Sequence, residues 1–328
     1  MFETLLKSSN LPILLSLLIV ISLLIAVISA NKYELFNSPA PSVLDSRPVL
    51  WFVLDDQANT RKQYGADFSI RNSKQNNRGY TELSYKAAKH TQGRDYQVIR
   101  LNGREDVVKT IKSYGGVVPE NVHILPPALW REYCRAALLA NAGGLFVDGD
   151  SVLFVGPSIK PFIESYDSAL FGINPDEPIV SGETALKPGP SSYVGYAKTS
   201  KQPAWLEAES EWKILIAAGP PSFTAAIANR SNQKSMMKLR ESGVQVVRHA
   251  EANRKKDGKY LNLYDIFARS PSRPDNSFDI SNKAAYISFD SDLLERSAQL
   301  SFILKLSPEQ IEESDFLFSR LVKQAINS

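Results

Sequence analysis

The sequence has few of the residues that build disulfides and zinc sites. Among its 328 residues there are one cysteine and three histidines. A single cysteine excludes an internal disulfide and any multi-cysteine zinc site, and three histidines do not favour a histidine-rich metal cluster. Any metal ion should therefore be a hard cation bound by carboxylate oxygens, such as Mg²⁺ or Mn²⁺.

A large excess of one charge is also absent. The chain has 38 Lys and Arg residues against 35 Asp and Glu residues, which gives a net charge of +3. Nucleic-acid-binding domains usually carry a strong, clustered basic surface, so no nucleic-acid partner is expected. The basic segment at 248–259 is interpreted as a solvated loop, with a surface for lipid head groups or an anionic acceptor as the alternative.

One long apolar run is present, at residues 11–30, and it contains no charged residue. At about 1.5 Å per residue, a helix of this length spans roughly the 30 Å hydrocarbon core of a bilayer. A cleaved signal peptide, the alternative, usually has an apolar region of about 7–15 residues. We therefore expect an uncleaved transmembrane anchor, preceded by a short tail at 1–10 and followed by a stem at 31–47. Lys7 and Lys32 flank the run, so the positive-inside rule does not fix its orientation.

Residues 48–328 are expected to form the folded domain, because strand and helix patterns alternate along them. This alternation is typical of an α/β domain with a mostly parallel central sheet. Ser307 and Gln310 form a capping-box pattern that predicts a C-terminal helix, whose core-facing residues would be Ile311, Phe318, Leu321, Val322 and Ala325. Further strands are expected at 48–56, 95–103 and 145–155, and further helices at 81–93, 103–116 and 125–144.

The segment Asp148-Gly149-Asp150 has three interpretations. It can be a hairpin turn between two short strands, because aspartate and glycine tolerate positive φ. With Val152 it also fits the D-x-D-x-[TV] motif of haloacid-dehalogenase-like phosphatases, in which the first aspartate is the nucleophile and the second the acid/base. Finally, two carboxylates at a strand end can share one divalent cation, and the glycine lets a diphosphate approach the backbone.

The residues around this segment favour the metal site. Residues 129–154 resemble the DxD-region signature of family 32 glycosyltransferases, a group that includes Golgi α-1,6-mannosyl- and α-1,4-galactosyltransferases and related capsular-polysaccharide synthesis proteins. Glu132 and Arg135 stand at the acidic and basic positions of its helix, followed by Gly143-Gly144 and the D-x-D pair. The family usually has aspartate where this chain has Glu132.

A second block agrees with the resemblance. Residues 214–229 resemble the family's strand, Gly-Pro pair and following helix, with Gly219-Pro220 at the motif. The resemblance implies a GT-A-like fold over 48–328 and a membrane-anchored, metal-dependent glycosyltransferase. Such an enzyme moves a sugar from a nucleotide-diphosphate donor to a glycan or other hydroxyl acceptor, with retention of configuration. It also implies a type II protein whose domain faces the Golgi or secretory lumen, or an equivalent compartment.

The resemblance assigns site residues as well, although no catalytic residue follows from it. Asp148 and Asp150 would hold Mn²⁺ or Mg²⁺, and Arg135, Gly144, Gly219, Pro220 and Asp55 would contact the donor together with this pair. Members of the family often have a late histidine in the metal shell, whereas this chain has Ser288 at the comparable place and no histidine after His249. Four alternatives follow: Asp290 or Asp292 replaces it, water fills the position, metal binding is weak, or the chain is a non-catalytic relative that binds nucleotide-sugar or glycan.

Other polar and aromatic residues have weaker assignments. Asp55 and Asp56 follow the first strand, where a nucleotide base and ribose would lie in such a sheet, and capping of a turn is the alternative. The Gly-, Pro- and Ser-rich stretch at 177–212 is interpreted as a long loop and assigned to the acceptor side. Its aromatic residues are candidates for stacking on sugars, with core packing as the alternative for each: Tyr193, Tyr196, Trp205 and Trp212. Three polar residues are interpreted as solvated loop residues rather than diphosphate ligands: Arg61, Arg71 and Asn72.

Overall fold

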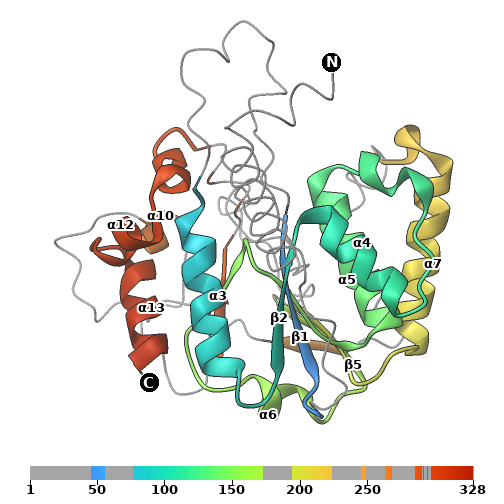
Figure 1. Ribbon diagram of the computed structural model, residues 1–328, viewed down its shortest axis with the longest axis horizontal. Coiled ribbons are helices and arrows are strands. Elements are labelled where there is room, and N and C mark those ends of the chain that lie inside the picture. The colour runs from blue at the N-terminus through green and yellow to red at the C-terminus, as the bar shows by residue number, and fades with distance from the viewer. Residues whose placement is uncertain are drawn as a thin grey trace, which may run out of the picture. The chain divides into compact units, whose positions relative to one another are not determined.

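A six-stranded sheet forms the centre of the fold (Figure 1). Its strands are β1 (Val49–Leu54), β2 (Gln97–Asn102), β3 (Gly144–Asp148), β5 (Ser168–Gly172), β6 (Val194–Ala197) and β7 (Gln245–Arg248). They lie in the order β2-β1-β3-β6-β5-β7, and β6 alone runs against the other five. The predicted α/β class with a mostly parallel central sheet is therefore confirmed.

The computed structural model describes residues 46–55, 77–172, 194–223, 245–248, 263–267, 285–289, 291, 294 and 297–327. All of them belong to one compact unit, residues 46–328. The predicted anchor at 11–30 lies outside the described residues. Within those residues, no helix combines the length and the apolar character that crossing a bilayer requires.

Helices cover both faces of the sheet. Helix α3 (Gly79–Gln92) lies on one face, and α4 (Gly103–Ser113), α5 (Pro127–Asn141) and α7 (Pro203–Ala218) lie on the other (Figure 1). Side chains of a strand alternate between the two faces. Trp51 of β1 accordingly packs in the core that contains α5, while Phe52 packs in the core that contains Ala88 of α3. Burial on both sides explains why β1 is apolar at every position.

Helix α5 leads directly into the central strand β3, and its ends are set by the predicted residues. It begins at Pro127, where the missing N–H costs no hydrogen bond, and it is followed by Gly143 (φ 70°) and Gly144 (φ 91°). A Cβ atom on Gly144 would lie 2.4 Å from the Val49 carbonyl oxygen of β1. Only glycine therefore fits where the chain turns from α5 into the sheet.

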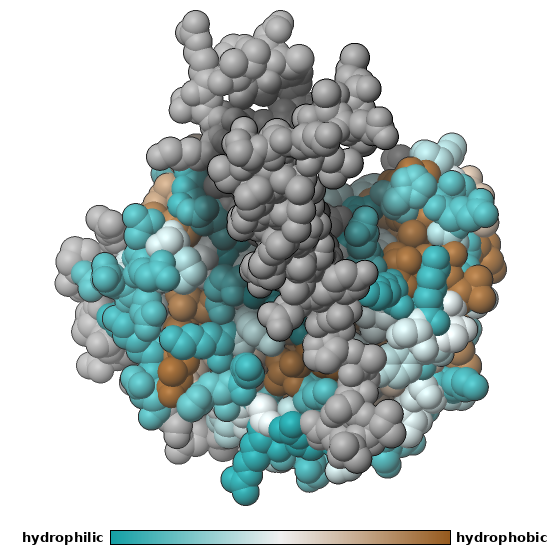
Figure 2. Space-filling model, viewed as in Figure 1, coloured by the Kyte–Doolittle hydropathy of each residue, from teal (hydrophilic) through white to brown (hydrophobic). Residues whose placement is uncertain are grey.

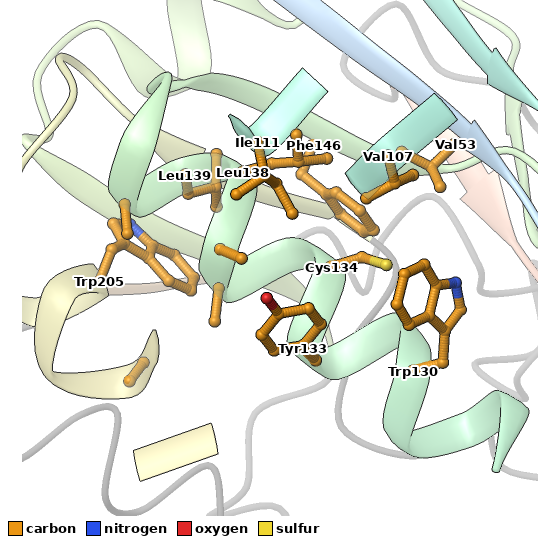
Figure 3. Packing of buried hydrophobic residues seen from close by; sticks show 14 of the residues in the cluster. Val53, Val107, Ile111, Trp130, Tyr133, Cys134, Leu138, Leu139, Phe146 and Trp205 are labelled. Atoms are coloured by element: carbon orange, nitrogen blue, oxygen red, sulfur yellow. The ribbon is translucent and has the colours of Figure 1, made fainter. Parts of the chain in front are cut away.

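The apolar face predicted for α5 is confirmed. Trp130, Tyr133, Cys134 and Leu138 are buried, and they lie in one packed cluster with Phe146 of β3 (Figure 3). Cys134 is a core thiol, as expected. This packing fixes α5 against the sheet, so that residues on its first turns have a defined position relative to the end of β3.

A second, smaller sheet continues from the first. Strand β4 (Val152–Phe154) pairs with β8 (Tyr286–Ser288) in antiparallel orientation. Around Tyr80 of α3, a separate apolar cluster brings together α10 (Leu263–Phe267), α12 (Pro308–Glu312) and α13 (Leu317–Asn327). The remaining described elements are short: α6 (Lys160–Ile163) and the 3₁₀ helices η3 (Glu120–Ile124) and η6 (Ser301–Lys305).

The C-terminal helix differs from its prediction in one respect. The capping box of Ser307 and Gln310 is present, and the five predicted core residues are all buried. However, the segment forms two helices, α12 and α13, rather than one. The chain breaks between them because Phe316 enters the core. At the end of α12, the backbone N–H and the hydroxyl of Ser314 both donate to the Ile311 carbonyl, at 3.0 Å and 2.6 Å.

Candidate functional site

The Asp148-Gly149-Asp150 segment is not a hairpin turn. Strand β3 pairs with β1 and β6, whereas β4 pairs with β8, so the segment carries the chain from one sheet to the other. The Gly149 N–H donates to the Val53 carbonyl of β1 at 2.7 Å. A Cβ atom on Gly149 would lie 2.3 Å from the Phe52 ring, so glycine is required here by close packing.

The segment lies at the point of the sheet where ligands of α/β proteins usually bind. The chain passes from β1 to β2 on one side, and β3 lies on the other side of β1. In open α/β sheets, ligands bind outside the carboxyl ends of the strands where the strand order reverses in this way. Asp148 is the last residue of β3, and Asp55 follows the last residue of β1.

The structure brings together three of the predicted site residues: Asp55, Asp148 and Asp150. The backbone N–H of Asp55 donates to Oδ2 of Asp150 at 2.7 Å, and the backbone N–H of Asp150 donates to Oδ1 of Asp148 at 3.2 Å. The side chains of the last two are buried, with residue exposures of 2% for Asp148 and 3% for Asp150. Burial of two carboxylates is unfavourable unless cations or hydrogen-bond donors surround them.

Two arginines that the sequence prediction missed supply the positive charge. Nη1 of Arg131 lies 3.3 Å from Oδ2 of Asp148, and Nη1 of Arg78 lies 3.3 Å from Oδ1 of Asp150. Both arginines are nearly buried, at 6% and 8% exposure. Arg131 stands one helical turn before the predicted Arg135, so its place on α5 was readable from the sequence. Arg78 carries no such sequence signal.

Arg135 forms an ion pair with Glu132, three residues earlier on α5. Both side chains are buried, and the Arg135 guanidinium carbon lies 5.9 Å from the centre of the Trp205 ring of α7. A Cβ atom on Gly195 of β6 would lie 2.8 Å from Cδ of Arg135. Arg135 therefore occupies a fixed place between α5, α7 and β6. Its contact with a donor stays a prediction.

Gly144 lies at the other end of β3 from the aspartates. It stands four positions before Asp148, which at about 3.3 Å per strand residue places it roughly 13 Å away. Its conformation and its packing against Val49 account for the glycine. The structure thus does not bring Gly144 to the acidic pair.

The prediction of a strand at the start of residues 214–229 is wrong. Residues 214–218 are the last turns of α7, and Gly219 (φ 79°) ends that helix. Ile214 is 69% exposed, whereas Ile216 is fully buried. Residues two apart share a face in a strand but not in a helix, so this difference fits a helix. On the visible side of the molecule, apolar side chains gather over α7 (Figure 2). The donor-binding role of Gly219 and Pro220 stays a prediction, without the expected strand before them.

Trp205 and Tyr196 belong to the core rather than to an open platform. Trp205 is fully buried, and its indole N–H donates to the Tyr196 carbonyl at 2.9 Å. Burial raises the pKa of the Tyr196 phenol, with smaller contributions from Asp167 and Glu164. Trp212 packs against the same cluster. The stretch predicted as a long loop at 177–212 in fact contains β6 and most of α7, because its apolar residues pack against α5 and β3.

Several predicted residues lie outside the described part of the chain. These are Asp56, Arg61, Arg71, Asn72, Tyr193, Asp290 and Asp292, together with 249–259 of the basic segment. Two neighbours of the possible third ligands are described. Phe289 donates its N–H to the Ser151 carbonyl at 2.9 Å, and the Ser291 hydroxyl lies 2.9 Å from the Ser151 hydroxyl.

The oxygen atoms of Asp148 and Asp150 fit a hard divalent cation in chemical type. Among the described residues, no group of three or more histidine, cysteine, aspartate or glutamate side chains is placed to hold a metal ion. Mg²⁺ is usually bound by one or two carboxylates, substrate phosphates and water, and does not need a complete cage of protein ligands. Two carboxylates are therefore enough protein ligands for a cation of this kind.

No family model matches the chain, and neither a curated protein nor a solved structure matches it.

Proposed function

We propose that this protein is a membrane-anchored, metal-dependent glycosyltransferase with a GT-A-like domain. It transfers a sugar from a nucleotide-diphosphate donor to a hydroxyl group of a glycan or other acceptor. The observation that carries the proposal is the buried pair Asp148 and Asp150 at the carboxyl end of β3, beside the strand-order reversal and next to Arg78 and Arg131.

The chemistry of the donor explains why this arrangement suits it. The leaving group is a diphosphate, whose negative charge must be stabilised as the bond to the sugar breaks. Mn²⁺ or Mg²⁺ bound by Asp148 and Asp150 supplies part of that positive charge. Arginine supplies a planar set of donors that matches phosphate oxygens, and α5 carries Arg131 and Arg135 one turn apart. No side chain is assigned as a catalytic base, because transfer with retention by attack on the same face does not require one.

Membrane attachment is part of the proposal. It rests on the uncharged run at 11–30, and the resemblance to Golgi transferases supports an orientation in which the domain faces the secretory lumen or an equivalent compartment.

One observation favours a second candidate, a non-catalytic relative that binds nucleotide-sugar or glycan without turnover. The Asp148 and Asp150 carboxylates already have arginine partners, which a metal ion would have to displace. The phosphatase interpretation has less support, since the nucleophile of that fold lies on the first strand and Asp148 ends the third strand in chain order.

The experiment that separates these functions uses the full chain purified in detergent. The protein is incubated with a panel of UDP- and GDP-sugars and Mn²⁺, and free nucleoside diphosphate is measured. We expect release by the wild type and none by Asp150→Asn, whose amide is a poor ligand for the cation. Asp167→Asn, which alters an exposed ion pair with Lys198, is the matched control and should keep full activity.

Other results would favour the other candidates. Binding of a nucleotide-sugar without release of nucleoside diphosphate would support the non-catalytic relative. Release of inorganic phosphate from simple phosphoesters would support the phosphatase.

A further inference from the structure

The four oxygen atoms of the acidic pair all have partners, and these partners are of two kinds. On each carboxylate, one oxygen accepts from a backbone N–H, that of Asp150 for Asp148 and that of Asp55 for Asp150. The other oxygen faces a guanidinium, that of Arg131 or of Arg78. A cation that binds the pair must therefore compete with two positive charges already placed there.

The two arginines reach the pair from opposite sides of the sheet. Arg131 belongs to α5, and Arg78 precedes the first residue of α3, which covers the other face (Figure 1). Arg78 has a left-handed backbone conformation (φ 44°), and its N–H donates to the Leu304 carbonyl at 3.0 Å, so the chain is fixed where it presents this side chain. Together the arginines frame the end of β3.

Arginine is suited to more than one anionic partner. It stays charged at every relevant pH, and its planar donors match a phosphate group as well as they match a carboxylate. The two aspartates and two arginines sum to zero charge. A divalent cation together with the diphosphate of a nucleotide-sugar, which carries two negative charges, leaves this sum unchanged, whereas either one alone changes it.

We propose that Arg78 and Arg131 are exchangeable counter-ions, which pair with Asp150 and Asp148 when the site is empty and with the donor diphosphate when a divalent cation takes the carboxylates. This inference rests on the proposed function. It makes the two arginines positioning residues that couple metal binding to donor binding. The cation alone binds weakly because the guanidiniums oppose it, and the diphosphate alone binds weakly because the guanidiniums are engaged.

The coupling is measurable in both directions. Since coupling between two ligands is reciprocal, a nucleoside diphosphate must strengthen Mn²⁺ binding by the same factor by which Mn²⁺ strengthens nucleotide binding. The test measures Mn²⁺ affinity of the full chain by calorimetry, without nucleotide and with saturating UDP or GDP. The variants are Arg131→Gln and, as a control, Arg100→Gln, which removes an arginine from a surface ion pair with Glu82.

For Arg131→Gln, the inference predicts opposite changes in two quantities: the affinity for Mn²⁺ alone rises, and the tightening of Mn²⁺ binding by nucleotide falls. In the wild type and in Arg100→Gln, the nucleotide should tighten Mn²⁺ binding at least tenfold. In Arg131→Gln, Mn²⁺ alone should bind several-fold more tightly than in the wild type, because one competing charge is gone. The tightening by nucleotide should fall to threefold or less, since the diphosphate has lost a partner.

A second variant keeps the test valid where Arg131→Gln fails to fold. Arg131→Lys retains the charge, so Mn²⁺ alone should bind as in the wild type, while the coupling should fall because lysine lacks the planar donor pair. Unchanged coupling in the variant that folds, or weaker binding of Mn²⁺ alone to Arg131→Gln, would overturn the inference and leave the proposed function intact. Failure of wild-type protein to bind UDP or GDP with Mn²⁺ would instead reject the proposed function, and the inference with it.

Discussion

Removal of Arg131 should destabilise the folded domain far more than removal of a surface arginine. In Arg131→Met, the Asp148 carboxylate would remain 2% exposed without the guanidinium that faces it. Breaking a buried ion pair in this way costs about 3–5 kcal/mol. The contact joins one nitrogen to one oxygen at 3.3 Å rather than two pairs of atoms, so we take the lower end, about 3 kcal/mol.

This loss corresponds to a large shift in thermal unfolding. At about 2–4 °C per kcal/mol for domains of this size class, we expect the melting temperature to fall by about 6–12 °C. Arg100→Met is the matched control, because its partner Glu82 is 46% exposed at the side chain. An exposed ion pair contributes at most about 1 kcal/mol, so the control should shift by no more than about 4 °C.

The double variant Arg131→Met with Asp148→Asn separates charge from packing. The neutral amide needs no counter-ion, so the double variant should recover much of the stability that Arg131→Met loses. The assay is thermal unfolding of the full chain in detergent, followed by near-UV circular dichroism. A fall in Arg131→Met no larger than that of Arg100→Met, about 4 °C at most, would refute the reasoning, since the ion pair would then contribute no more than a surface contact.

Three further predictions test the turn and the metal. Gly149→Ala should lower the free energy of unfolding by about 1–3 kcal/mol, because its methyl group would lie 2.3 Å from the Phe52 ring; unchanged thermal unfolding would contradict this. Chelation of divalent cations with EDTA should abolish release of nucleoside diphosphate, and added Mn²⁺ should restore it; full release in EDTA would exclude metal dependence. If Asp290 is the third ligand, Asp290→Asn should weaken Mn²⁺ binding at least tenfold in the presence of UDP or GDP. Asp292→Asn is the comparison. Equal affinities for both variants and the wild type would remove both residues from the metal shell.

Local sequence rules predicted the elements that lead to the site. The apolar run of β1, the Pro127 start of α5 and the glycines after it follow from steric and hydrogen-bonding limits that act within a few residues. The burial of one face of α5 follows from its periodicity. These rules predicted that the two aspartates follow an apolar segment, whereas the position of β3 beside β1 is known only from the sheet pairing.

The rest depended on contacts between distant residues. Arg78 and Asp150 are 72 residues apart in the chain, and no local pattern relates them. The turn at Gly149 was ambiguous for the same reason, since an apolar strand on each side fits both a hairpin and a change of sheet. Only the pairing of β4 with β8 distinguishes them. Ile214 and its neighbours were assigned to a strand from the family resemblance, and the short apolar run could not correct this because it does not by itself separate strand from helix.

The cost of burying the four charges favours a ligand-binding role over a purely structural one. A buried ion pair is often no more stabilising than apolar residues of similar volume, because desolvation offsets the attraction. Asp148, Asp150, Arg78 and Arg131 are each less than 10% exposed, and they lie at the strand-order reversal rather than in either apolar core. An apolar turn at this place would avoid the desolvation cost. Charges kept at such a place are better explained by a charged ligand, and a cation with a diphosphate is the ligand that leaves the cluster neutral.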